Sequence, residues 1–130
     1  MRDVVVEIEL PIGVRSAWSL LTDRRHTWWS DLDFDAVADA PLIERWLDDD
    51  GREVTALGTI VDVDPPHRLS FVWTDPGAVQ TTVEWVVTAT DGGGSIVTVR
   101  ESGLDAAGAL QHEEGWRHHL DRLRAAVSRP

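Results

Sequence analysis

The sequence predicts an α+β fold in which one long C-terminal helix covers a curved antiparallel sheet of about six or seven strands. A helix is predicted over residues 105–127, because apolar and aromatic residues recur there at spacings of three and four. This stripe consists of Ala109, His112, Trp116, Leu120, Leu123 and Val127. Most of the remaining chain alternates apolar and polar residues, which is typical of strands that bury one face. A single long helix can cover that face.

The first strand and two short helices precede the main run of strands. The strand is predicted from the alternating residues Val4, Val6, Ile8 and Leu10. Helical spacing over residues 14–21 predicts the first helix, and Thr22-Asp23 ends it and can cap a second short helix. That second helix carries His26, Trp28 and Trp29.

The middle of the chain predicts strands joined by tight turns. They cover residues 34–38, 42–47, 54–63, 69–74, 82–88 and 95–102. Turn residues at Asp50-Gly51, Asp75-Pro76-Gly77 and Asp91-Gly92 favour hairpins, so neighbouring strands should be antiparallel. Strand 42–47 leaves two alternatives open. Its buried face is either Leu42, Glu44 and Trp46 or Ile43, Arg45 and Leu47.

Size and composition predict one domain over residues 1–130, long enough to bury a core without disulfides. Cysteine is absent, which excludes a disulfide framework and a thiol nucleophile. The short apolar run at the amino terminus is interrupted by Glu7 and Glu9, so we expect neither a signal peptide nor a membrane span. A cytoplasmic location is the default expectation.

Charge argues against nucleic acid and membrane partners. The chain has 23 acidic and 12 basic residues, all of the latter arginine, and a formal net charge of −11. Nucleic acid and anionic lipid both require clustered positive charge, and no basic stripe is present. The acidic excess is more simply explained by solubility than by a cationic partner.

Two motifs that resemble metal sites are incomplete. Asp31-x-Asp33-x-Asp35 resembles the start of an EF-hand loop, but Ala36 stands where glycine is needed and Leu42 where glutamate is needed. His112-Glu113 lacks the second histidine of a zinc-protease helix. We therefore expect no metal and no cofactor.

Four groups of residues stand out by their order and spacing: Leu20-Leu21-Thr22-Asp23 with Trp28-Trp29, residues 58–73, Glu101-Ser102-Gly103-Leu104 and His112-Glu113-Glu114-Gly115-Trp116. Together they resemble the SRPBCC superfamily, and within it most closely the homologues of the heat-shock-protein-ninety ATPase activator (AHSA-like). The resemblance covers nearly the whole chain. It implies the helix-grip fold, shared with START domains and aromatic polyketide cyclases, in which the helix and sheet enclose a pocket for apolar small molecules.

Candidate functional residues gather where the last strand meets the long helix. His112 and His119 are seven residues apart and share nearly one helix face, with Trp116 between them. Glu101 continues the inward alternation of the last strand. A buried carboxylate is costly unless paired, so we expect Glu101 to contact His112 or an arginine, a pair that could also transfer protons. Ordinary hydrogen bonding in a core is the alternative.

Tryptophan and glycine supply the other signals. Trp73, Trp85 and Trp116 are the predicted pocket walls, although ordinary packing explains each equally well. Gly115 lies within the predicted helix, where glycine costs roughly 1 kcal/mol relative to alanine. Either close packing or space left for a ligand would compensate.

Three function hypotheses follow. The first is a protein that binds a hydrophobic or aromatic small molecule in a cavity between the helix and the sheet. The second is a cyclase- or dehydratase-like enzyme in which His112 and Glu101 transfer protons. The third is a co-chaperone-like interaction with another protein. A homodimer through a sheet or helix surface is compatible with each.

Overall fold

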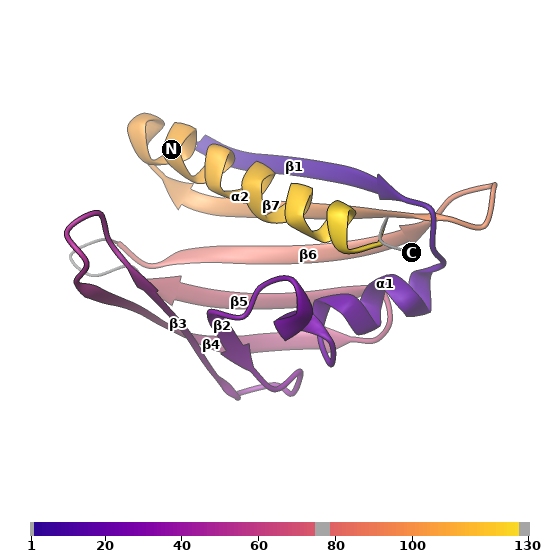
Figure 1. The fold of residues 1–130 in the computed structure, drawn as a ribbon, viewed down its shortest axis with the longest axis horizontal. Coiled ribbons are helices and arrows are strands. Elements are labelled where there is room, and N and C mark those ends of the chain that lie inside the picture. The colour runs from indigo at the N-terminus through magenta and orange to yellow at the C-terminus, as the bar shows by residue number, and fades with distance from the viewer. Residues whose placement is uncertain (1, 75–78, 128–130) are drawn as a thin grey trace.

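A computed structural model of the chain describes residues 2–74 and 79–127. Its seven strands form one antiparallel sheet in the order β1-β7-β6-β5-β4-β3-β2, so β1 leaves the sequential order and pairs with β7 (Figure 1). The strands are β1 (Arg2–Leu10), β2 (Leu32–Phe34), β3 (Pro41–Leu47), β4 (Glu53–Asp64), β5 (Arg68–Thr74), β6 (Thr81–Ala89) and β7 (Ser95–Leu104). The helices are α1 (Val14–Leu21), the 3-10 turn η1 (Arg25–Thr27) and α2 (Ala106–Val127).

The predicted helix-grip arrangement is confirmed: a curved sheet, short helical segments after the first strand, and one long C-terminal helix (Figure 1). Two elements differ in detail. The second short helix is a single 3-10 turn that ends before Trp28 and Trp29. The strand expected over residues 34–38 ends at Phe34, because the chain turns there and Asp39 takes a left-handed φ of 70°. The turn predicted at Asp75-Pro76-Gly77 lies outside the described residues.

The alternation seen in the sequence sets which face of the sheet is buried. In β1, every second residue from Val4 to Leu10 is buried. Apolar residues at alternate positions of β5, β6 and β7 are buried on the same face of the sheet. In β3, Leu42 is fully buried and Trp46 half-buried, whereas Arg45 and Leu47 are exposed. The first of the two alternatives for this strand is therefore the observed one.

A buried arginine holds the segment between α1 and β2 in place. Arg25 Nε donates to the carbonyl of Leu32 at 2.8 Å and Nη1 donates to the carbonyl of Thr22 at 3.2 Å. The guanidinium also lies 4.0 Å from the centroid of the Phe34 ring. This anchoring fixes the following residues, so Trp28 and Trp29 both enter the core.

Helix α2 begins as the sequence predicts and packs chiefly on β1. Asp105 Oδ1 accepts a hydrogen bond from the Gly108 amide at 2.7 Å, which is N-cap geometry. Ala109, Trp116, Leu120 and Leu123 are buried along one stripe. Within the described residues, no helix is long and apolar enough to cross a membrane.

Candidate functional site

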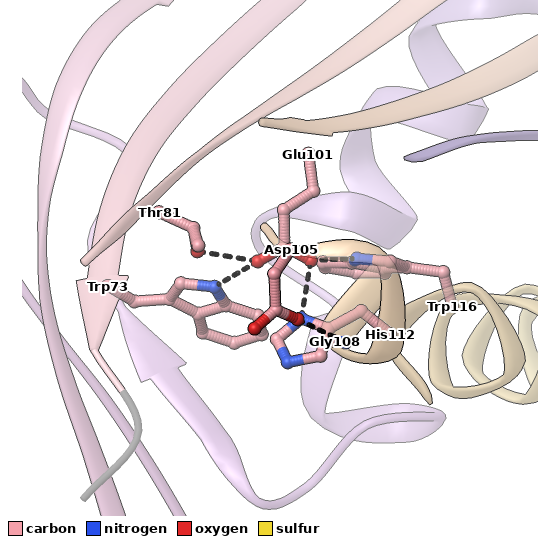
Figure 2. A network of polar contacts seen from close by, with 7 residues as sticks. All are labelled: Trp73, Thr81, Glu101, Asp105, Gly108, His112 and Trp116. Atoms are coloured by element: carbon pink, nitrogen blue, oxygen red, sulfur yellow. Dashed lines mark hydrogen bonds and ion pairs between the residues drawn. The ribbon is translucent and has the colours of Figure 1, made fainter. Parts of the chain in front are cut away.

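A buried carboxylate with four donors lies where β7 meets α2 (Figure 2). Glu101 is 0% exposed, and its cross-strand neighbours are the apolar residues Val4 and Val83. Its oxygens accept hydrogen bonds from Thr81 Oγ1 at 2.6 Å, His112 Nδ1 at 2.7 Å, Trp116 Nε1 at 2.8 Å and Trp73 Nε1 at 3.0 Å. Each oxygen therefore receives two hydrogen bonds.

These bonds keep Glu101 ionised. Burial by itself would raise the pKa of this carboxyl, but the hydrogen bonds from His112, Thr81, Trp73 and Trp116 outweigh burial and lower the pKa below its ordinary value of 4.5. A carboxylate so stabilised is a poor proton acceptor. Its role is to orient the groups that surround it.

His112 is the group of this network that also reaches the surface. Its side chain is 20% exposed, whereas that of Glu101 is 0% exposed. Since the ionised carboxylate can only accept, Nδ1 of His112 must carry the proton that it donates. The contact therefore fixes the ring plane and the tautomer of His112. The predicted contact between Glu101 and His112 is confirmed.

Two indoles flank the carboxylate and form a stacked pair. The ring centroids of Trp73 and Trp116 lie 5.6 Å apart with an interplanar angle of 25°. Trp29 meets Trp116 edge-on at 5.7 Å. Since both stacked indoles donate to Glu101, their planes are fixed by hydrogen bonds as well as by packing.

An open pocket of about 370 Å³ lies between α2 and β3. Its lining residues are Asp31, Glu44, Trp46, Trp73, Gln111, His112, Gly115, Trp116, His118, His119 and Arg122. A Cβ atom placed on Gly115 would meet no atom within 4 Å, so close packing does not explain this glycine. The space beside Gly115 instead belongs to the pocket.

His119 lines the same pocket in a different environment. Its ring stacks on Trp29, with centroids 3.8 Å apart and an interplanar angle of 15°. Nδ1 is buried and has no hydrogen-bond partner among the described residues. Burial lowers the pKa of His119 from 6.5 to about 4, and the positive charges of His118 and Arg122 add to the effect, so this imidazole is neutral near pH 7.

The chain matches a known family over most of its length. The family model described as Activator of Hsp90 ATPase homolog 1-like protein matches residues 13–128. The chain belongs to this family. No curated protein sequence matches the chain.

Solved structures of other proteins share the fold of this Hsp90-activator-like chain. CalU16 from Micromonospora echinospora superimposes with a TM-score of 0.82 at 22% identity, covering 98% of this chain and 76% of CalU16. DynU16, a protein of the dynemicin biosynthetic locus, superimposes with a TM-score of 0.81 at 25% identity. The match covers 95% of this chain but only 46% of DynU16. MLL2253 from Mesorhizobium loti superimposes with a TM-score of 0.77 at 22% identity, and the match covers 95% of both chains. The chain thus spans about half of DynU16.

Of the six site residues predicted from the sequence, four line the pocket of this family member and two do not. Trp73, His112, Trp116 and His119 line it. Glu101 lies behind them and contacts the pocket residues instead of the pocket. Trp85 is 1% exposed and packs in the core against Trp29 and Phe71.

Sequence reasoning missed the pocket residues that come from β3 and from the later turns of α2. Glu44 and Trp46 belong to one of the two faces that the β3 pattern left open. Arg122 follows His119 by three residues, a spacing that places both on one side of a helix and would have revealed it. Among the described residues, no group of three or more metal-binding side chains is arranged to hold a metal ion.

Proposed function

We propose that the pocket between α2 and β3 binds an aromatic or hydrophobic small molecule. The observation that carries the proposal is Gly115: a glycine inside a helix costs roughly 1 kcal/mol relative to alanine, and here no packed atom compensates for it. The missing side chain leaves space beside Trp116 on the pocket wall. A pocket of about 370 Å³ is within the size range of small-molecule sites.

The composition of the walls supports an aromatic ligand. Trp46, Trp73 and Trp116 offer flat apolar surfaces, and two of these indoles are held in place by Glu101. Rigid aromatic walls lose little conformational entropy when a planar ligand stacks on them. The similarity to a protein from a biosynthetic locus is consistent with a small-molecule ligand.

Binding can be tested in two stages. Native mass spectrometry of the freshly purified protein first identifies any molecule that copurifies. An NMR titration with naphthol, naphthamide and naphthoate then follows the indole N–H signals of Trp46, Trp73 and Trp116. We expect these three signals to shift together with at least one probe.

A pocket-filling variant locates the binding. Gly115→Leu places a side chain in the open space of the pocket and should weaken binding at least tenfold, whereas Ala125→Leu, at an exposed position of the same helix, should leave binding unchanged. Unchanged binding to the Gly115→Leu variant would place the ligand elsewhere and overturn the proposal.

Proton transfer by His112 is the second candidate function, and its contact with Glu101 favours it. A carboxylate that accepts from Nδ1–H stabilises the imidazolium that forms when Nε2 takes a proton, as in other histidine acid–base sites. Glu101 would position His112 without itself exchanging protons. Once a ligand is identified, its conversion by the wild type and by His112→Asn can be compared by mass spectrometry. Equal conversion would remove His112 from the mechanism.

The third hypothesis, an interaction with a chaperone, stays a prediction. The exposed large apolar side chains come from separate elements: they include Val5 on β1, Leu57 and Val61 on β4, and Leu110 on α2. A pull-down with purified chaperone would test it.

A further inference from the structure

Arg122 differs from the neighbouring arginines of α2 in its ion pairing. Arg117 Nε lies 3.8 Å from Glu113, and Arg124 Nη1 lies 3.8 Å from Asp121. Arg122 forms no ion pair with any residue in the ranges 2–74 and 79–127. Asp31 lines the same pocket, but it does not pair with Arg122. In a chain with 23 acidic residues, an arginine on a pocket wall that has no acidic partner has a guanidinium available for a ligand.

His119, three residues before Arg122, provides a second and independent observation. Its imidazole is largely buried, stacked on Trp29, and makes no hydrogen bond with any described residue. A buried polar ring without a partner destabilises the folded protein. Since Nδ1 is enclosed, an unpaired proton there would cost more than an unpaired lone pair, so the proton belongs on Nε2. His119 is therefore a hydrogen-bond donor.

The groups whose charge lowers the pKa of His119 are both basic, although the pocket lining also includes the carboxylates of Asp31 and Glu44. The charges that act on His119 are those of His118 and Arg122. Glu44, a carboxylate that also lines the pocket, accepts a hydrogen bond from Trp29 Nε1 at 3.0 Å. The later turns of α2 thus present a guanidinium and an N–H donor on one wall of the pocket.

We infer that the ligand is an aromatic acid, whose rings lie against Trp73 and Trp116 and whose carboxylate or similar oxyanion lies against Arg122 and His119. The inference rests on the proposed function and names its ligand class. A planar guanidinium matches a carboxylate through two parallel hydrogen bonds. Gly115 and Arg122 are seven residues apart, or about 10 Å along a helix, which suits a bicyclic aromatic acid.

Matched probes and variants test the charge of the ligand. Naphthoate and naphthamide have the same shape and differ in charge, and naphthylmethylammonium carries the opposite charge. We expect naphthoate to bind the wild type at least tenfold more tightly than naphthamide. Arg122→Gln should remove that preference, because it should weaken naphthoate binding much more than naphthamide binding. Arg117→Gln is the control, because Arg117 pairs with Glu113 and does not line the pocket. This variant should keep the preference for naphthoate.

The outcomes separate this inference from the proposed function. Equal affinity for naphthoate and naphthamide, or tighter binding of the ammonium probe, would overturn the anionic ligand while leaving the pocket in place. An acid preference that survives Arg122→Gln would also overturn it. If none of the three probes binds, or if Gly115→Leu binds them as the wild type does, the proposed function itself fails.

Discussion

His112 and His119 line the same pocket from the same helix, yet their environments are opposite. His112 donates to a fully buried carboxylate, which in turn holds two indoles and a threonine. His119 has a stacked ring partner but no hydrogen bond to any described residue. The first environment is internally complete. The second contains a polar group whose hydrogen bonding the described protein does not satisfy.

The difference distinguishes a structural role on this helix from the binding role that we propose for it. A satisfied buried network rigidifies its surroundings, so the Glu101 network fixes the wall on which a ligand would stack. The unsatisfied buried Nδ1 of His119 costs stability with or without a ligand, whereas the N–H at Nε2 of the same ring is a donor that a ligand can pair. Three substitutions test this contrast.

The largest expected effect follows from Glu101→Gln. The amide loses the negative charge and replaces one accepting oxygen with an NH₂ group, so some of the donors from Trp73, Thr81, His112 and Trp116 lose their acceptor. We expect the free energy of unfolding in urea to fall by about 3–5 kcal/mol, as when a buried ionic network is broken. Glu84→Gln on the outer face of β6, where Glu84 pairs with Arg68 at the surface, should cost less than about 1 kcal/mol. Similar losses for both variants would contradict the role assigned to Glu101.

A smaller effect, with a pH dependence, is expected from His119→Phe. The pKa of His119 is lowered from 6.5 to about 4, so between these values the unfolded chain binds a proton that the folded protein does not. The free energy of unfolding of the wild type should therefore fall by about 3 kcal/mol as the pH falls from about 6.5 to 4. Phenylalanine keeps the stack on Trp29 and cannot be protonated.

The measurement is the difference in unfolding free energy between His119→Phe and the wild type. This difference should shift in favour of the variant by about 3 kcal/mol as the pH falls from about 7.5 to 4. His26→Gln, which replaces an exposed histidine, is the control. A difference that is constant with pH would mean that His119 is accessible to protons in the folded state, and the contrast with His112 would fail.

The contrast between the two histidines also marks where sequence-based prediction succeeded. The stripe on α2 and the inward alternation of β7 were enough to bring Glu101 and His112 together, because helix and strand periodicity determine which residues face the core. The environment of His119 was not predictable, since it depends on Trp29, whose position follows from the non-periodic segment held by Arg25. The contribution of β3 to the pocket was undecided for a related reason: its two faces carry similar mixtures of apolar and charged residues.

Gly115, between the two histidines, gives the smallest expected effect and tests what the open wall is for. Alanine at this position gains helix propensity and its Cβ meets no atom within 4 Å, so Gly115→Ala should raise the free energy of unfolding by about 1 kcal/mol. Gly108→Ala is the matched control, because a Cβ there would lie 3.1 Å from Asp105 Oδ1, the N-cap acceptor, and should gain less. A loss of stability in Gly115→Ala would mean that the glycine serves the fold. A gain accompanied by weaker binding of an aromatic probe would mean that the missing side chain serves the ligand.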